Sequence, residues 1–286
     1  MKDRGPPPLY GLIGFPLAGS LSPRLHTAAL AACGLPGHYV ALPVVPDLLS
    51  DGVRGVRAFG LAGVNVTIPH KVAVVPLLDG LTALASRVGA VNTLFWEGGR
   101  LIGDNTDVGG FLAALPPSTP TDGEALLIGA GGAARAVALA LASRGCEALH
   151  VVARREQGAE ELRAALVPGM AGAAVSLADV PALVDRAPRC KVVVNATPVG
   201  SHGDACPLPG EVLAALPADA VVVDLVYRLE DTTLVKRARG RGLVAGDGRE
   251  MLVRQAALSF ERWTGVAPPL EPLREAVGGT DAEAWR

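Results

Sequence analysis

The stretch "ALLIGAGGAARAVALALA" (Ala125–Ala142) decides the fold of the region around it. A short apolar run ends in a glycine-rich turn, and small apolar residues then continue for the length of a packed helix. Gly129, Gly131 and Ala134 have the G-x-G-x-x-A spacing, in which the glycines make the turn and let a pyrophosphate approach the backbone. We therefore predict a strand, a turn and a helix that bind a dinucleotide; a tight turn without a ligand is the alternative.

Four further apolar segments follow this stretch, with helical patterns between them: "ALHVVARR", "KVVVNATP", "AVVVDLVY" and "GLVAGDG". Five such segments favour a Rossmann-like sheet. The first of the four ends in Arg154 and Arg155, where an NAD site usually has an acidic residue for the ribose 2′-hydroxyl. Guanidinium groups suit a 2′-phosphate instead, so the predicted cofactor is NADP. Two solvated arginines beside Glu156 are the alternative.

Upstream of this stretch, short apolar runs alternate with helical patterns in the order βαβαβ, which predicts an α/β fold with a mainly parallel sheet covered by helices. Ser22 and Pro23 are typical of the N-cap and first position of a helix, and Gly34 of its end. The segment "VNTLFWEGGRLIGD" (91–104) predicts a hairpin at the sheet edge. The proline-rich segment Leu115–Glu124 is the predicted linker between two domains.

Composition excludes several classes of protein. Half of the residues (50%) are hydrophobic, which rules out a disordered chain, and the net charge of -2 comes with scattered Lys and Arg rather than a basic stripe for nucleic acid. The four cysteines have no CxxC spacing and the five histidines no HExxH, so neither a metal site nor a disulfide framework is indicated. Arg135 and the glycines near it argue against a membrane span, and no export signal is visible. We expect a cytoplasmic protein with a small-molecule substrate.

A second set of residues is polar and stands at the ends of predicted segments of the first sheet, where open α/β proteins build ligand sites. Each residue alone is typical of a cap or turn, but together their hydroxyls and amides suit a polyhydroxylated substrate. The set consists of Ser20, Ser22, Asn65, Thr67, Asn92 and Asp107.

Lys71 follows the strand pattern of "NVTIP" almost at once, as a solvated loop cation or as an ammonium delivered to a substrate. Gln255 shares one face of an amphipathic helix with four neighbours, Met251, Leu252, Leu258 and Ser259. A buried amide at that position needs hydrogen-bond partners, as a satisfied core glutamine also would.

Seven motifs occur in one order along the chain: "GxPLxxSLSP", "NVTIPHK", "GAVNTL", "GDNTDxxG", "GAGGAAR", "NATPVG" and "MLxxQAxxxFxxWTG". Together they resemble the shikimate dehydrogenase family, and the resemblance covers roughly Tyr10 to Gly265. It implies NADPH-dependent, reversible reduction of 3-dehydroshikimate to shikimate, a step toward aromatic amino acids. It also implies an α/β substrate domain over 1–115 that the C-terminal helices 249–286 complete, and a Rossmann-like NADP domain over 116–248. The active site would lie in the interdomain cleft of a monomer or homodimer.

The resemblance also assigns roles to residues. Lys71 and Asp107 become the catalytic pair, because hydride arriving at a carbonyl carbon leaves negative charge on oxygen that a positioned ammonium stabilises and protonates. Ser20 and Ser22 would donate to the substrate carboxylate, with Tyr227 and Thr67 nearby. The ring hydroxyls would be held by Asn65, Asn92, Asp107 and Gln255. The cofactor would be held by Gly129, Ala130, Gly131, Gly132, Ala133, Arg154, Arg155, Thr197 and Gly248.

The sequence departs from the family pattern beside the predicted 2′-phosphate site. NADP-dependent members commonly have Asn-Arg-Thr there, whereas this chain has Ala153, Arg154 and Arg155, so only Arg154 matches. Two other functions stay open at this stage. One is a paralogue that acts on quinate as well as shikimate, possibly with NAD, and the other is a non-catalytic dinucleotide-binding regulator on the same fold.

Overall fold

The computed structural model describes residues 6–120, 122–228, 230–279 and 285, and the chain divides into two compact units. The first unit runs to Gly110 and resumes over Leu252–Gly279, and the second covers Phe111–Met251. The domain boundaries predicted from the sequence were 115/116 and 248/249. Residues 280–284 and 286, which it assigned to the first domain, lie outside the described residues.

The first unit contains a six-stranded sheet in the order β2-β1-β3-β5-β6-β4. Its strands are β1 (Leu9–Gly14), β2 (His38–Pro43), β3 (Gly63–Val66), β4 (Gly80–Leu81), β5 (Thr93–Glu97) and β6 (Arg100–Asp104). β1 pairs in parallel with β2 and β3, and β4 in parallel with β6, while β5 is antiparallel to both β3 and β6.

The predicted hairpin over 91–104 forms as β5 and β6, with Gly98 and Gly99 in the left-handed region at its turn. Its expected place at the sheet edge is wrong, because β4 pairs with β6 on the outside. β4 has only two residues, and a segment that short carries no alternating pattern that a sequence could reveal.

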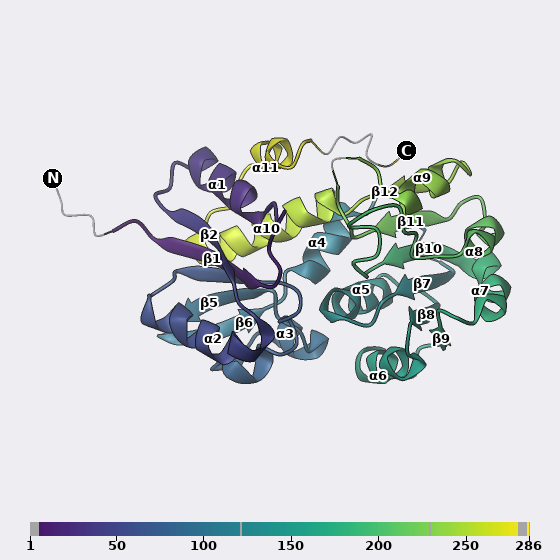
Figure 1. Cartoon of the computed structure of the whole chain (residues 1–286), viewed down its shortest axis with the longest axis horizontal. Coiled ribbons are helices and arrows are strands. Elements are labelled where there is room, and N and C mark those ends of the chain that lie inside the picture. The colour runs from purple at the N-terminus through teal and green to yellow at the C-terminus, as the bar shows by residue number, and fades with distance from the viewer. Residues whose placement is uncertain (1–5, 121, 229, 280–284, 286) are drawn as a thin grey trace. The chain divides into compact units, whose positions relative to one another are not determined.

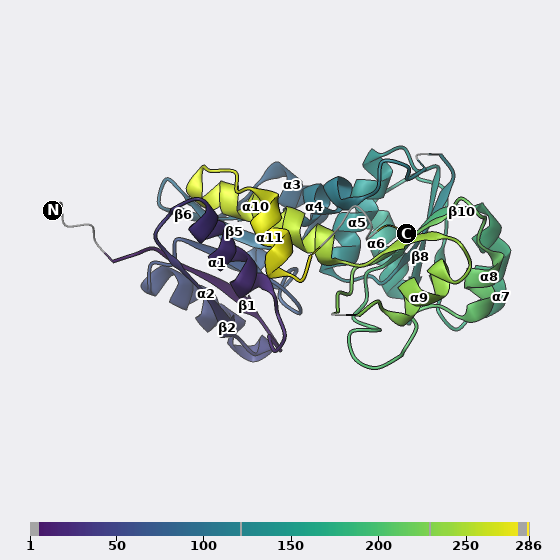
Figure 2. The ribbon, with the colours of Figure 1, turned by 90° about the horizontal axis from the view of Figure 1, so that it is seen from above.

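Two layers of helices cover this sheet, one on each face (Figure 1). Tyr10 and Leu12 of β1 pack against α1 (Ser22–Ala32), α10 (Arg249–Thr264) and α11 (Leu270–Ala276). Ile13 points to the opposite face, where α2 (Leu49–Ala58) and α3 (Ala83–Val88) lie. Figure 2 shows α1 and α11 side by side over the sheet, as Figure 1 does.

The start of α1 corrects one detail of the sequence analysis. Ser22 is the first residue inside the helix and Leu21 occupies the cap position, with no side-chain cap hydrogen bond. Pro23 is in the first turn, where its missing N–H is no loss, and Gly34 lies just beyond the helix end with φ of 62°. The Ser22 hydroxyl is therefore not engaged in capping α1.

The second unit contains six parallel strands in the order β12-β11-β10-β7-β8-β9, the Rossmann order that changes direction between β7 and β10. The strands are β7 (Glu124–Ile128), β8 (Ala148–Ala153), β9 (Ala174–Ser176), β10 (Cys190–Asn195), β11 (Val221–Asp224) and β12 (Val244–Gly246). Five were predicted, and β9 was missed because it has only three residues. The predicted α/β fold with a Rossmann-like unit is confirmed.

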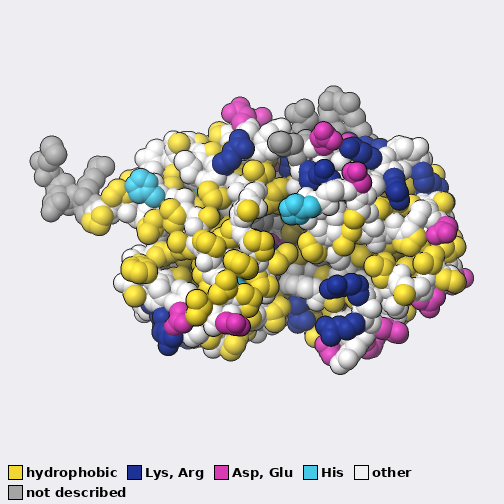
Figure 3. Space-filling view, in the orientation of Figure 1, with side chains coloured by type: hydrophobic (Ala, Val, Ile, Leu, Met, Phe, Trp, Pro, Cys, Tyr) yellow, Lys and Arg dark blue, Asp and Glu magenta, His cyan; other side chains and the backbone are white. Residues whose placement is uncertain are grey.

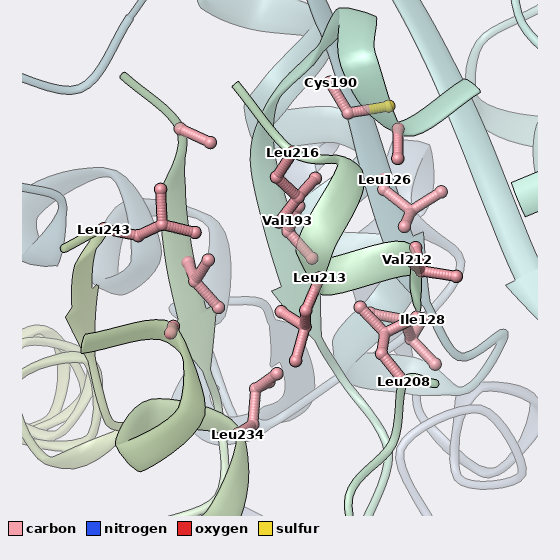
Figure 4. Packing of buried hydrophobic residues seen from close by; sticks show 14 of the residues in the cluster. Leu126, Ile128, Cys190, Val193, Leu208, Val212, Leu213, Leu216, Leu234 and Leu243 are labelled. Atoms are coloured by element: carbon pink, nitrogen blue, oxygen red, sulfur yellow. The ribbon is translucent and has the colours of Figure 1, made fainter. Parts of the chain in front are cut away.

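The helices of this part of the chain are α4 (Asp107–Ala114), α5 (Gly132–Ser143), α6 (Glu156–Leu166), α7 (Val180–Arg186), α8 (Gly210–Ala215) and α9 (Thr233–Arg239). One face of the second sheet is an apolar core in which Leu126 and Val193 meet Val212, Leu213 and Leu234 from α8 and α9 (Figure 4). Burial of such side chains stabilises a fold by about 1.5 to 3 kcal/mol each, before entropy is counted.

Candidate active site

Lys71 and Asp107 form an ion pair with both side chains largely removed from water. The Nζ–Oδ2 distance is 2.6 Å, and the side chains are 15% and 4% exposed. Lys71 lies in the loop after β3, and its carbonyl oxygen accepts from the Val91 N–H at 2.7 Å, which ties that loop to the segment before β5. Asp107 is the first residue of α4. Lys71 is thus not a solvated loop cation.

The Asn92 amide lies beside this pair. Its Nδ2 donates to Asp107 Oδ1 at 2.8 Å and lies 3.3 Å from Gln255 Oε1, while its Oδ1 accepts from the Thr106 backbone N–H at 2.8 Å. Gln255 also donates through Nε2 to the Leu252 carbonyl at 2.9 Å. Three predicted site residues, Asn92, Asp107 and Gln255, are therefore in direct contact.

Gly110 explains how Gln255 reaches this cluster. It lies one turn after Asp107, and a Cβ built on it would be 2.6 Å from the Cβ of Gln255. Only glycine lets the helix that begins with Asp107 come this close to α10. The approach brings the Gln255 amide, from near the end of the chain, beside Asn92 and the Asp107 carboxylate at the start of α4.

Both hydrogens of the Asn65 amide nitrogen, on β3, are bonded to other protein groups. Nδ2 donates to the Asn92 carbonyl oxygen at 3.1 Å and to Ser259 Oγ at 3.0 Å, and Oδ1 accepts from the Tyr39 hydroxyl at 2.8 Å. The Tyr39 ring stacks on His26, with 4.3 Å between ring centroids. Burial lowers the pKa of His26 to about 3, and the nearby Asn65 side chain offsets only part of this shift.

The two serines and Thr67 are the remaining predicted substrate residues of the first unit. The Ser22 backbone N–H lies 3.4 Å from Ser20 Oγ, so both hydroxyls lie at the start of α1. Ser22 is buried and Ser20 and Thr67 are half-buried. Thr67 follows β3 two residues after Asn65, as the extended pattern of "NVT" predicted.

The glycine-rich turn of the second unit has the geometry that its spacing predicted. Gly129 has φ of 117°, and a Cβ on it would lie 3.1 Å from both the Ala196 carbonyl oxygen and Thr197 Cγ2. Gly131 has no described atom within 4 Å of a Cβ position, so its outer side is open. Helix α5 begins at Gly132, and Ala134 is fully buried against the sheet. Open backbone at a helix N-terminus is what a phosphate group requires.

Arg154 and Arg155 lie directly after β8, and both are exposed. Neither guanidinium makes a hydrogen bond or ion pair with another described residue. Thr197 follows β10, where the Asn195 amide oxygen accepts from the Thr197 N–H and hydroxyl at 3.0 and 2.7 Å.

Gly248 follows β12, and a Cβ there would lie 2.2 Å from the Leu225 carbonyl oxygen. Tyr227, half-buried, follows β11 in the second unit.

The sequence missed the residues that support this site. Tyr39, Thr93, Thr106 and Ser259 all contact the Asn65 or Asn92 amide, and all are buried. Two weak signals existed: Thr106 precedes Asp107, and Ser259 lies one helical turn after Gln255. Thr93 is the neighbour of Asn92 in the chain, but nothing in the sequence pairs Ser259 with Asn65, which lies 194 residues away.

Strand pairing brings together a group that no sequence spacing revealed. Glu124, His150 and Cys190 lie on three adjacent strands, with possible metal-ligand atoms within 4.8 Å of one another. Glu124 is engaged by His150 at 2.6 Å and by Arg189 at 3.0 Å. Burial raises the pKa of the Cys190 thiol to about 12, which disfavours the thiolate that binds metals. Glu124 is thus engaged by a hydrogen bond with His150 and an ion pair with Arg189, and the Cys190 thiol donates to the Arg186 carbonyl instead.

Surface charge agrees with a small-molecule site. On the face drawn in Figure 3, Lys and Arg side chains are interspersed with Asp and Glu and do not merge into one basic surface. In the part of the chain that the structure describes, every helix is too short or too polar to cross a membrane.

Comparison with known proteins connects these features to one family. Residues 12–94 match the shikimate dehydrogenase substrate binding domain, 116–202 the shikimate / quinate 5-dehydrogenase family, and 248–277 the shikimate 5′-dehydrogenase C-terminal domain. A shikimate dehydrogenase (NADP(+)) of Symbiobacterium thermophilum is 44% identical over 96% of this chain and 95% of its own length.

Solved structures agree with the sequence relatives. The crystal structure of shikimate 5-dehydrogenase from Thermus thermophilus, in complex with NADP(H) and shikimate, has a TM-score of 0.83 at 38% identity, over 95% of this chain and 98% of that one. A quinate dehydrogenase from Corynebacterium glutamicum in complex with NAD has the same TM-score at 32% identity, over 95% and 99% of the two chains. With its two α/β units and full-length similarity to these proteins, the chain belongs to the shikimate dehydrogenase family.

Proposed function

We propose that this protein is an NADP-dependent shikimate dehydrogenase, which reversibly reduces 3-dehydroshikimate to shikimate. The observation that carries the proposal is the desolvated Lys71–Asp107 pair, 2.6 Å apart, with the Asn92 amide and Gln255 beside it. A regulator without catalytic function would have no need to bury this pair. Relatives named as NADP-dependent shikimate dehydrogenases are 38% to 45% identical to this chain over 93% or more of its length.

The first unit would bind the substrate. The hydroxyls of Ser20 and Ser22 would donate to the carboxylate, with Thr67 near it, and Tyr227 of the second unit would be the remaining residue for this group. The ring hydroxyls would bind to Asn65, Asn92, Asp107 and Gln255. This division fits the chemistry of the two groups, because the serines carry neutral donors and the second group combines amides with a carboxylate.

Lys71 and Asp107 would supply the proton that the substrate oxygen takes up during reduction. When hydride reaches the carbonyl carbon, negative charge develops on the carbonyl oxygen, and Lys71 Nζ would stabilise that charge and transfer a proton to the oxygen. Asp107 Oδ2, 2.6 Å from Nζ, would orient the ammonium. Asp107 Oδ1 is held by the Asn92 amide, so the carboxylate cannot turn away from Lys71 without losing that bond.

The second unit would bind NADPH, which supplies the hydride when bound. Its residues fit a dinucleotide phosphate, because the outer side of Gly131 is open and α5 begins directly after it. Arg154 and Arg155 offer two exposed guanidinium groups for a 2′-phosphate, and no acidic residue stands at the end of β8. The phosphates would lie along Gly129, Ala130, Gly131, Gly132 and Ala133, with Thr197 and Gly248 as the other cofactor residues.

A spectrophotometric assay tests the proposal directly. The purified protein is given NADP or NAD as oxidant, with shikimate or quinate as substrate, and nicotinamide reduction is followed. We expect the highest kcat/KM with NADP and shikimate. Higher kcat/KM with NAD and quinate would identify a quinate dehydrogenase, and no turnover of any pair would favour the regulator.

We further propose a cytoplasmic enzyme that is a monomer or homodimer. The four cysteines are free, as is usual in a reducing compartment. Light scattering on the purified protein distinguishes the two oligomeric states.

A further inference from the structure

We infer that Thr93, Thr106 and Ser259 position the Asn65 and Asn92 amides without touching the substrate. Backbone groups set which way each amide faces, and the three buried hydroxyls hold the amides in that orientation. Thr106 is central, because it contacts Asn92 through both its backbone and its side chain. The inference rests on the proposed function, in which both amides bind ring hydroxyls.

The orientation of Asn92 follows from a backbone N–H, which can donate a hydrogen bond but cannot accept one. The Thr106 backbone N–H donates to Oδ1 at 2.8 Å, so this end of the amide has to be the oxygen. Nδ2 then faces the Asp107 carboxylate at 2.8 Å and Gln255 Oε1 at 3.3 Å. A flipped amide would place oxygen against the carboxylate and nitrogen against an N–H, losing both bonds and adding repulsion.

The orientation of Asn65 follows from a backbone carbonyl, which can accept a hydrogen bond but cannot donate one. Its Nδ2 donates to the Asn92 backbone carbonyl at 3.1 Å, so the nitrogen has to lie on this side, and its second hydrogen goes to Ser259 Oγ at 3.0 Å. Oδ1 accepts from Tyr39 at 2.8 Å, and both Nδ2 hydrogens already have protein partners. Asn65 can therefore only accept a hydrogen bond from a substrate, which requires a hydroxyl rather than a carbonyl at that position.

The three hydroxyls connect the two amides. Ser259 Oγ lies 2.7 Å from Thr93 Oγ1 and 3.1 Å from Thr106 Oγ1, and Thr93 Oγ1 donates to Asn92 Oδ1 at 3.0 Å. Ser259 is anchored to its own helix by the Gln255 carbonyl at 3.1 Å. The exposed fractions of Thr93, Thr106 and Ser259 are 0%, 6% and 0%. Buried hydroxyls cost free energy unless they are bonded, and here every one is bonded to an amide or to another hydroxyl of the cluster.

The test replaces the Thr106 hydroxyl with a methyl group of the same size. In Thr106→Val we expect KM for shikimate to rise about tenfold and kcat to fall, because the Asn92 amide loses the hydroxyl that lies 2.9 Å from Nδ2 and 3.2 Å from Oδ1 and is then held by the Thr106 backbone N–H and fewer side chains. KM for NADP should stay within about twofold of the unmodified enzyme. Thr106→Ser, which restores the hydroxyl, should recover both constants to within about threefold. Thr119→Val is the matched control, since Thr119 is similarly buried, lies in the second unit, and its hydroxyl donates to the Pro116 carbonyl.

Ser259→Ala keeps the inference testable if Thr106→Val does not fold. It removes the hydroxyl that accepts from Asn65 Nδ2 at 3.0 Å and lies 2.7 Å from Thr93 Oγ1, so KM for shikimate should rise several-fold with kcat almost unchanged. The inference is overturned if Thr106→Val or Ser259→Ala folds and has unchanged KM, or if Thr106→Ser is as impaired as Thr106→Val. If instead the unmodified enzyme does not turn over shikimate, it is the proposed function that fails.

Discussion

Lys71 and Asp107 are held by backbone as well as by each other. The Lys71 carbonyl is bonded to Val91, and the Asp107 N–H donates to the Asn105 side chain at 3.1 Å, so both side chains start from fixed points. A flexible lysine would lose rotamer freedom when it binds a substrate, and this lysine has lost that freedom already. The site is therefore organised before substrate arrives.

The first prediction concerns the Lys71 ammonium. If it stabilises charge and supplies a proton mainly in the transition state, Lys71→Met should lower kcat by about 10² to 10⁴, with shikimate still bound. Methionine keeps much of the side-chain volume, so the fold should be retained by circular dichroism. Asp107→Asn should also be severe, and the double variant should lose far less than the product of the single losses. Near-normal kcat in Lys71→Met would leave the proton donor unidentified.

The second prediction concerns cofactor choice. Arg154→Ala should raise KM for NADP much more than KM for NAD, because about 1.5 to 3 kcal/mol of charge-assisted hydrogen bonding to the 2′-phosphate is lost. Arg155→Ala is the comparison, since Arg155 is the N-cap residue of α6 and has no counterpart in the family pattern. Steady-state kinetics with both cofactors measure the effect. Equal turnover of NAD and NADP by the unmodified enzyme would contradict it.

At the scale of elements, the sequence predicted the long or strongly patterned segments and missed the short ones. The strand, turn and helix of 125–142 form as β7 and α5, because glycines and small residues leave little choice there. β4 and β9 have two and three residues and exist only because a neighbouring strand offers unpaired backbone groups. Ser22 was misassigned as a cap because serine and proline also suit the first turn inside a helix.

The third prediction separates the two glycines of the β7–α5 turn. Gly129→Ala should destabilise the fold, because φ of 117° and a carbonyl oxygen at 3.1 Å both oppose a side chain. Gly131 has φ of -84° and open space, so Gly131→Ala should cost less than about 1 kcal/mol of stability. It should nevertheless raise KM for NADP, because the methyl group occupies the approach to the backbone. Urea denaturation and kinetics measure the two effects; unchanged KM in Gly131→Ala would contradict a phosphate site at this turn.

At the scale of the whole molecule, the candidate site could be predicted only in part. The polar residues at strand ends were recognisable, since parallel strands bring their ends together. The bonds among them were not, because Asn65 and Ser259 lie 194 residues apart and meet through the packing of α10 on the first sheet. Orientation of an amide depends on such partners, and no pattern of single residues encodes it.

Two buried titratable groups give the two units opposite responses to pH. His26 in the first unit has its pKa lowered by burial from 6.5 to about 3, so the unfolded chain binds the extra proton between these values and stability is lost as pH falls below 6.5. Asp224 in the second unit has its pKa raised by burial from 3.8 to about 6. The folded chain keeps that proton up to a higher pH than the unfolded chain does, so stability is lost as pH rises from 3.8 to 6.

The last prediction uses one variant in each unit to isolate these contributions. His26→Phe keeps a ring against Tyr39 and cannot titrate, so its stability relative to the unmodified protein should improve as pH falls from 6.5 to 4.5. Asp224→Asn keeps a side-chain oxygen for the Asn195 amide, and its relative stability should improve as pH rises from 4 to 6 and stay constant above that. Each change should amount to about 1 to 3 kcal/mol, since one pKa unit corresponds to about 1.4 kcal/mol. Urea denaturation at each pH measures both differences, and groups common to all three proteins cancel. Parallel pH dependence of His26→Phe and Asp224→Asn would contradict the opposite signs assigned to the two groups.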